Sequence, residues 1–228
     1  AFGWFRRDAH RPPAYLNILL TLLAVVHGSL VLREVMANGP ALIGMPWLTV
    51  GDLNLEISFS LSLTNVSALE LITGLSLLSQ IYSLGYLDKE WALARFFALL
   101  GFFEGAMSGV VLSDSLFQSY FLLEMLTLST YLLVGFWYAQ PLVVTAARDA
   151  FLTKRVGDVM LLMSVVALTA WSGVTSFDDL YSWSAQDTLT PLAATLLGLG
   201  LVAGGMVRSQ WLGMARAMRR MNRLYMDN

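Results

Sequence analysis

The sequence predicts an all-α integral membrane protein. It is expected to be a polytopic bundle of about six transmembrane helices, because about 20 apolar residues span a bilayer. Of the 228 residues, 57% are hydrophobic and only 13% are charged, and the mean hydropathy is +0.63. A soluble domain carries about 25% charged residues. The polar surface is therefore too small to cover a water-exposed globule.

Six apolar stretches are each long enough to cross about 30 Å of hydrocarbon as a helix. They cover residues 14–32, 65–86, 93–112, 116–137, 151–171 and 189–207. Helices are expected because isolated strands cannot satisfy their backbone hydrogen bonds in lipid.

The segment between the first two stretches has a different periodicity. Apolar residues alternate at one parity, at Leu53, Leu55, Ile57, Phe59, Leu61 and Leu63. Alternation with a period of two is typical of a strand. A small extramembrane β-hairpin is therefore expected at about residues 45–64.

The basic residues test this topology. When the chain is threaded through six spans, all but Arg33 of the 14 basic residues fall on one side. Basic loops face the cytoplasm or its equivalent. The cytoplasmic side is expected to hold residues such as Arg6, Lys89, Arg148 and Arg216. The opposite side is expected to hold acidic residues such as Asp52, Asp114 and Asp178.

Composition also excludes several classes of site. The chain has no Cys and only two His, so disulfides, thiolate metal sites and Cys-ligated iron–sulfur clusters are excluded. The net charge of −2 is spread without a domain-wide basic surface of the kind that binds nucleic acid. We therefore expect no cofactor, metal or nucleic acid on this chain.

Four carboxylates lie inside the predicted spans, at Glu70, Glu104, Glu124 and Asp158. An ionisable residue in the membrane costs at least about 2.5–3.5 kcal/mol on insertion scales, and such residues mark proton or ion pathways. For Glu70, near the start of its span, a structural hydrogen bond to a neighbouring helix and a functional role are both open.

Two cations accompany Asp158 on its predicted helix. Lys154 is four residues and Arg155 three residues before it, so either can share its helix face. A neighbouring cation favours an ionised carboxylate, whereas burial favours the neutral form. Groups with such opposed tendencies suit a proton relay, and Glu124 is expected to approach this face. The alternative is that Lys154 and Arg155 only anchor the helix at the membrane surface.

Two motifs carry a resemblance to a known family. Residues 129–138 read STYLLVGFWY after Glu124, and residues 150–158 read AFLTKRVGD. With IYSLGY at 81–86, they resemble the antiporter-like subunit 5 of complex I, whose cyanobacterial and chloroplast form is NdhF. One departure is Leu123, where relatives usually have Trp.

The resemblance implies a proton-transfer site. The Glu that matches Glu124 belongs to such a site in the family, and the residues that match Arg155 and Asp158 accompany it. A lysine on a later helix, beyond the segment that aligns, completes the family site. Residues 1–207 are then the antiporter-like bundle of a longer family domain. Residues 208–228 read as a basic amphipathic helix, expected to come from a later part of the natural chain.

A narrower resemblance concerns Glu104. Residues 103–107 (FEGAM), 139–141 (AQP) and 146–149 (AARD) are similar to the variants found in CO2-uptake complexes. There, Glu104 would be an added proton station that accepts the proton released by CO2 hydration. The alternative is a protonated Glu104 hydrogen-bonded to a backbone carbonyl of a neighbouring helix.

The resemblance implies a proton-translocating subunit of a ferredoxin- or NAD(P)H-linked plastoquinone oxidoreductase, coupled to CO2 uptake and hydration. Iron–sulfur clusters and plastoquinone would be bound by other subunits. The expected partners are other membrane subunits, including a second antiporter-like one, a peripheral CO2-hydrating protein and lipids of a cyanobacterial thylakoid membrane. Two alternatives are open: a subunit of a multi-subunit Na+/H+ antiporter, and a passive anchoring scaffold.

Overall fold

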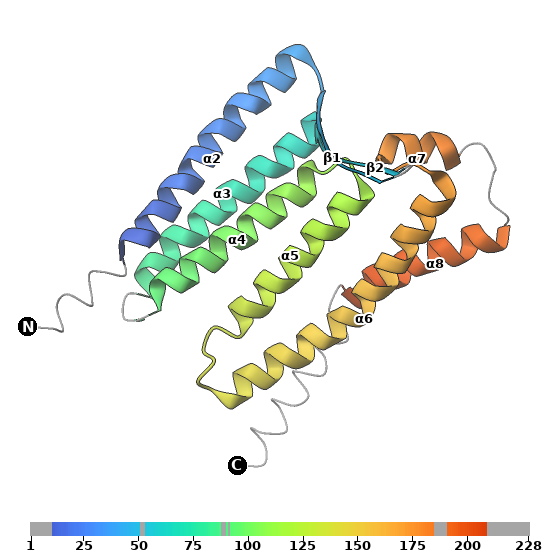
Figure 1. The fold of residues 1–228 in the computed structure, drawn as a ribbon. Coiled ribbons are helices and arrows are strands. Elements are labelled where there is room, and N and C mark those ends of the chain that lie inside the picture. The colour runs from blue at the N-terminus through green and yellow to red at the C-terminus, as the bar shows by residue number, and fades with distance from the viewer. Residues whose placement is uncertain (1–10, 51–52, 88–89, 91, 185–190, 209–228) are drawn as a thin grey trace, which may run out of the picture. The chain divides into compact units, whose positions relative to one another are not determined.

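The computed structural model describes residues 11–50, 53–87, 90, 92–184 and 191–208, as Figure 1 shows. These residues form two compact units. The first contains α2, the strands β1 and β2, α3 and α4, and the second contains α5 to α8.

The first unit is built on three helices that lie side by side in Figure 1. They are α2 (Arg11–Asn38), α3 (Leu63–Tyr86) and α4 (Leu93–Leu112). Each of the three packs against the other two. Neighbours along the chain run in opposite directions, so the start of α2 and the start of α4 lie at the same end.

Local residues set the ends of these helices. Gly39 follows α2 with φ of 90°, and its N–H donates to Val35 O at 3.0 Å. This left-handed conformation after a helix is one that glycine adopts without strain. Ser62 caps α3, where its side chain accepts from the Asn65 N–H at 3.2 Å, which satisfies an otherwise free donor.

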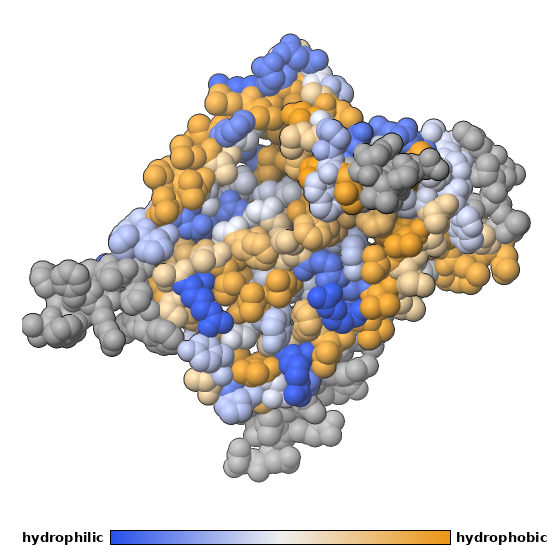
Figure 2. All heavy atoms as spheres, in the orientation of Figure 1, coloured by the Kyte–Doolittle hydropathy of each residue, from blue (hydrophilic) through white to orange (hydrophobic). Residues whose placement is uncertain are grey.

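The interior of the first unit is partly polar, while its outer surface is apolar. Buried residues recur at every seventh position of α2, at Ala14, Thr21, Gly28 and Val35. In α3 the same spacing gives Val66, Thr73 and Gln80. Large side chains such as Leu71 point outward, and Figure 2 shows apolar atoms along α2. This arrangement fits a unit surrounded by lipid.

The predicted hairpin is confirmed. It consists of β1 (Ala41–Val50) and β2 (Leu53–Leu61), which pair in a two-stranded sheet. It spans residues 41–61 and not the predicted 45–64, because Ser62 caps α3 and Leu63 already lies in that helix. The Asp114 N–H donates to Ser58 O at 3.1 Å, so the hairpin is tied to the end of α4.

The second unit contains four helices. They are α5 (Leu116–Val134), α6 (Pro141–Ser172), the short α7 (Phe177–Ser184) and α8 (Pro191–Arg208). The helix α6 packs against both α5 and α8. No helix is expected from the sequence at α7, which is too short to span a membrane.

The start of α6 corrects the sequence prediction. The helix was expected at 151–171 but begins ten residues earlier, at Pro141, with Gln140 as its cap. Proline suits the first position of a helix, where its missing N–H has no partner to lose. Lys154 and Arg155 therefore lie about 20 Å along the helix, at 1.5 Å per residue, and not in its first turns.

Small residues allow α8 to approach α6 closely. A Cβ added at Gly204 would lie 3.0 Å from Leu161 N and 3.1 Å from Gly157 O. Both are backbone atoms, which cannot move aside as a flexible side chain can. This close approach is typical of helix packing in membranes. Gly198, on the same helix, has no atom within 4 Å of such a Cβ.

Gly204→Ala is therefore expected to destabilise the α6–α8 pair by about 1–3 kcal/mol, the usual cost of overpacking. Gly198→Ala is the matched control. It is expected to be neutral or to stabilise by up to about 1 kcal/mol, the difference in helix propensity. Unfolding of the two variants in mixed detergent micelles measures both values. Equal stabilities would contradict the close approach.

Each of the six predicted stretches corresponds to a helix among the described residues, although 116–137 is helical only to Val134 and residues 189–190 lie outside the described part. Among the described helices, α2, α4 and α5 are long and apolar enough to cross a membrane by length and composition alone. The apolar part of α8 is shorter, α3 contains several polar residues, and α6 carries five charged ones. At 1.5 Å per residue, even the 18 residues of α8 extend about 27 Å.

Charges within each unit follow the predicted sidedness. In the first unit, Arg11 and Arg95 lie near the starts of α2 and α4, at one end, and Asp114 lies at the other. In the second unit, Arg148 is near the start of α6, and Asp178 follows its far end. Residues 209–228, which hold most of the predicted amphipathic helix, lie outside the described part.

Candidate functional site

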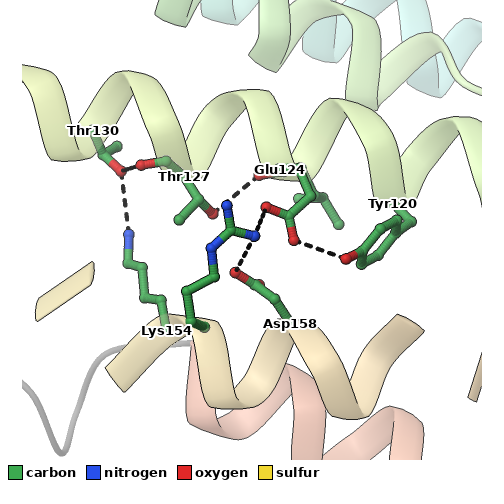
Figure 3. A network of polar contacts seen from close by, with 8 residues as sticks. Tyr120, Glu124, Thr127, Thr130, Lys154 and Asp158 are labelled. Atoms are coloured by element: carbon green, nitrogen blue, oxygen red, sulfur yellow. Dashed lines mark hydrogen bonds and ion pairs between the residues drawn. The ribbon is translucent and has the colours of Figure 1, made fainter. Parts of the chain in front are cut away.

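Glu124 is the centre of a polar network in the second unit, between α5 and α6 (Figure 3). Its Oε1 accepts a hydrogen bond from the Tyr120 hydroxyl at 2.9 Å, one turn earlier on α5. Its Oε2 accepts from Arg155 Nη1 on α6 at 2.5 Å. The Glu124 side chain is 17% exposed, so a mostly buried carboxylate is held by a phenol and a guanidinium.

Asp158 faces the same guanidinium. Its Oδ2 lies 4.0 Å from Arg155 Nη1, and its side chain is 1% exposed. The predicted approach of Glu124 to the Lys154–Asp158 face is confirmed, with Arg155 as the cation between the two carboxylates. Arg155 also lies over the Phe151 ring, with Cζ 4.9 Å from the ring centroid, a cation–π contact that helps to orient it.

Lys154 extends toward a different part of α5. Its Nζ donates to Thr130 Oγ1 at 3.3 Å, and Thr130 Oγ1 donates to Thr127 O at 2.8 Å. A pocket of about 40 Å³ is lined by these three residues and by apolar neighbours including Phe151. This pocket has room for water, because one water needs about 10–15 Å³ by this measure.

The network assigns different chemical roles to its cations. An arginine guanidinium stays protonated in proteins, so Arg155 can orient and neutralise the carboxylates but does not carry a proton itself. In the predicted proton-transfer site, the part of Arg155 would therefore be to hold the carboxylates. Lys154, Glu124 and Asp158 are the other ionisable side chains expected there, and they lie on two adjacent helices.

Glu104 forms a second network, in the first unit. Its Oε2 accepts from Thr21 Oγ1 at 2.8 Å on α2, and from Ser76 Oγ at 2.7 Å and Gln80 Nε2 at 2.9 Å on α3. Gln80 Nε2 also donates to Thr21 Oγ1 at 2.7 Å. Glu104 is only 7% exposed, and one carboxylate oxygen thus connects all three helices.

The hydrogen bonds of Glu104 among the described residues go to side chains of α2 and α3. The proton station and the structural hydrogen bond between helices both stay predictions for Glu104. Glu70, the fourth carboxylate, accepts from Ser29 Oγ at 2.6 Å through Oε1, so it does bond to a neighbouring helix.

Two family models match the chain. Residues 47–97 match the N-terminus of chain 5 of NADH-ubiquinone oxidoreductase (complex I), and residues 113–215 match the transmembrane domain of NADH:quinone oxidoreductases and Mrp antiporters. A subunit 5 of NAD(P)H-quinone oxidoreductase from the organellar chromatophore of Paulinella chromatophora is 72% identical over 206 residues, which cover 90% of this chain. The chain belongs to the antiporter-like subunit 5 family.

Other members of the subunit 5 family are more distant. The chloroplastic NAD(P)H-quinone oxidoreductase subunit 5 of Agrostis stolonifera is 35% identical over 207 residues, which cover 86% of this chain. This chain spans 33% of the Paulinella protein and 28% of the Agrostis protein. It therefore corresponds to about a third of the length of these relatives.

Two solved structures share the fold of this subunit 5 segment. A chain of the Mrp complex from Dietzia sp. DQ12-45-1b superposes with a TM-score of 0.68 at 21% identity, over 88% of this chain and 21% of that one. A chain of an archaeal membrane-bound sulfane sulfur reductase superposes with a TM-score of 0.71 at 14% identity, over 84% of this chain and 38% of that one. The antiporter-like membrane fold is therefore confirmed.

The two networks differ in how they relate to the subunit 5 family. Glu124, Arg155 and Asp158 lie within the stretch matched at 113–215. Glu104 lies between the two matched stretches, and its partner Thr21 precedes both.

Sequence reasoning missed the neutral members of both networks. Tyr120 and Thr130 are ordinary residues of an apolar helix, although Tyr120 stands four residues before Glu124, at the spacing of a helix face. Gln80 could have been found, because an amide within a predicted span also needs a partner. Ser76 lies one turn before Gln80 on the same face.

Proposed function

We propose that this chain is part of a proton-translocating subunit of a ferredoxin- or NAD(P)H-dependent plastoquinone oxidoreductase, in the form coupled to CO2 uptake and hydration. The observation that carries the proposal is the pair of carboxylates, Glu124 and Asp158, which face one guanidinium between two membrane helices. The names of the relatives support the oxidoreductase as the complex to which the chain belongs.

Proton uptake at Glu124 would change its bond to Arg155. An ionised Glu124 holds the guanidinium at 2.5 Å, and protonation removes the charge that makes this bond strong. Arg155 can then turn toward Asp158, now 4.0 Å away. The proton on Glu124 thereby strengthens the ion pair at Asp158, and loss of the proton reverses the change.

Lys154 supplies the next group in this path. Water in the pocket beside Thr130 can receive a proton from the Lys154 ammonium, which leaves a neutral amine and a hydronium ion. Lys154 stands four residues before Asp158 on α6, and transfer between them would proceed stepwise through water, because a proton moves only over hydrogen-bond distances. Thr127 and Thr130 would hold such water in place.

Glu104 would serve the CO2 reaction. Hydration of CO2 yields bicarbonate and one proton, and it proceeds more readily when that proton is removed. Glu104, a carboxylate buried among three helices, can accept the proton as a general base. Residues 103–107 resemble those of CO2-uptake variants, which supports the same assignment.

The remaining parts of the proposal concern the assembly. A second antiporter-like subunit and a peripheral CO2-hydrating protein would be partners. Iron–sulfur clusters and plastoquinone would be bound by other subunits, and these 228 residues offer no Cys to ligate a cluster. The chloroplastic and chromatophore relatives support a photosynthetic membrane, and a cyanobacterial thylakoid is proposed.

The transported ion tests the proposal against its alternatives. The complex that contains the full-length protein is reconstituted into liposomes with a plastoquinone analogue and a reduced ferredoxin donor, and internal pH is recorded. We expect acidification that depends on quinone reduction and is unchanged by removal of Na+. Proton movement driven by a Na+ gradient without quinone reduction would indicate an antiporter instead.

A further inference from the structure

The interface between α2, α3 and α4 is polar in the middle and apolar at both ends. At the end where α2 and α4 begin, Ala14, Leu87, Leu93 and Phe97 form a buried cluster. Toward the hairpin, the buried residues Val35 and Val66 take their place. Between these apolar layers lie the Glu104 network and, nearer the hairpin, Glu70 with Ser29.

Several buried polar atoms of this middle region have no partner among the described residues. They are Asn17 Nδ2, Gln80 Oε1, Ser108 Oγ and Glu70 Oε2. Gln80 is 0% exposed. Its Nε2 is hydrogen-bonded within the Glu104 network, whereas its Oε1 is not. Buried polar groups in proteins are nearly always hydrogen-bonded, to protein or to ordered water. We therefore expect ordered water molecules to be hydrogen-bonded to these four atoms.

Two of the four atoms, Ser108 Oγ and Glu70 Oε2, belong to residues on the hairpin side of Glu104, and a third, Gln80 Oε1, lies beside Glu104. Gln80 Oε1 is at the level of Glu104, because the same side chain binds that carboxylate. Ser108 is four residues beyond Glu104 on α4, which is the same helix face and about 6 Å nearer the hairpin. Glu70 is six residues, or about 9 Å, from Ser76 on α3.

Glu70 also points into this interface. A Cβ added at Gly28 of α2 would overlap Glu70 Oε2, so the missing side chain of Gly28 leaves the space in which this oxygen lies. Thr73 is 3% exposed and stands between Glu70 and Ser76 on α3. Along α3, no buried apolar side chain therefore stands between Glu70 and Ser76, whose hydroxyl binds Glu104.

We propose that Glu104 and Glu70 are joined by a file of internal water molecules along the α2/α3/α4 interface and exchange a proton through it. In this step Glu104 gives its proton to the nearest water, each water passes one proton on, and Glu70 receives the last. The products are an ionised Glu104 and a protonated Glu70. The inference extends the role proposed for Glu104, since it supplies a place for the accepted proton.

The exchange is tested on the complex that contains the full-length protein, by two measurements. A high-resolution cryo-EM map should show water density beside Gln80 Oε1, Ser108 Oγ and Glu70 Oε2. Infrared spectra should show the carbonyl band of protonated Glu104, identified by its loss in Glu104→Gln. We expect Glu70→Gln to shift the pH at which this band appears, because the two groups share a proton.

Two glycine variants provide a matched pair. Gly28→Ala forces the Glu70 carboxylate out of its space and is expected to shift the Glu104 band as Glu70→Gln does. Gly74→Ala lies on α3, where an added Cβ meets no atom within 4 Å, and should leave the band unchanged. An interface without ordered water overturns the proposal. It is also overturned if the pH at which the Glu104 band appears is unchanged in both Glu70→Gln and Gly28→Ala.

These measurements separate this inference from the proposed function. Neither requires turnover of the complex, whereas the proposed function is tested by proton transport. If transport behaves as expected and the Glu104 band is independent of Glu70, only the water file is wrong. If Glu104 and Glu70 are coupled but no transport occurs, the water file stands and the proposed function fails.

Discussion

Arg155→Met is expected to lower proton transfer through the assembled complex by roughly 100-fold or more, because the acid–base carboxylates Glu124 and Asp158 lose the cation that positions them. The substitution removes the 2.5 Å bond to Glu124 and the cation that faces Asp158. Two carboxylates then share a buried region with no cation between them, which is costly. Proton transport in proteoliposomes measures the loss.

Arg148→Met is the matched control for this result. Arg148 lies seven residues earlier on the same helix and pairs with Asp149, but the two side chains are 61% and 44% exposed. An exposed pair contributes about 0–1 kcal/mol, so this variant should transport protons at nearly the normal rate. Equal losses in both variants would mean that any change of charge on α6 disturbs the complex.

Glu104→Gln is expected to lower CO2 hydration and the accompanying proton transfer by roughly 100-fold. Glutamine keeps the shape and offers an oxygen to Thr21, Ser76 and Gln80, so the three helices should remain packed. What it removes is the proton acceptor. The rates are measured as bicarbonate formation and proton release by the complex, and stability is measured in parallel.

Glu56→Gln is the control for Glu104→Gln, because Glu56 is an exposed carboxylate on the hairpin. It should change neither rate. If complexes with Glu104→Gln keep full hydration and proton-transfer rates, Glu104 only packs the helices and the CO2-linked assignment is wrong.

The main features of the fold could be predicted because lipid imposes simple rules. The stretches 93–112 and 116–137 carry enough apolar residues to reveal their helices directly, and the alternation of Leu53 to Leu63 revealed the hairpin. The start of α6 was not predicted, because charged residues between apolar stretches, here Arg148 and Asp149, are typical of a loop. In the structure Pro141 begins the helix and these charges lie on its exposed surface.

The charged members of the candidate site could be predicted, but their partners could not. An isolated charge in an apolar span is conspicuous, which singled out Glu104, Glu124 and Asp158. The distinction between Lys154 and Arg155 depends on which part of α5 each side chain reaches, and spacing within one helix leaves both possible. Hydroxyl and amide partners such as Tyr120 and Gln80 are found only when the helices are packed together.

The most direct test of the central claim is proton transport by the full-length protein with Glu124→Gln in its complex. Glutamine preserves the size of the side chain and an acceptor for Arg155, but it cannot bind and release a proton. The account predicts a normally assembled complex that reduces quinone and moves protons at roughly 1% of the normal rate or less. An assembled complex with unchanged proton transport would contradict it, and the Glu124 network would then be structural.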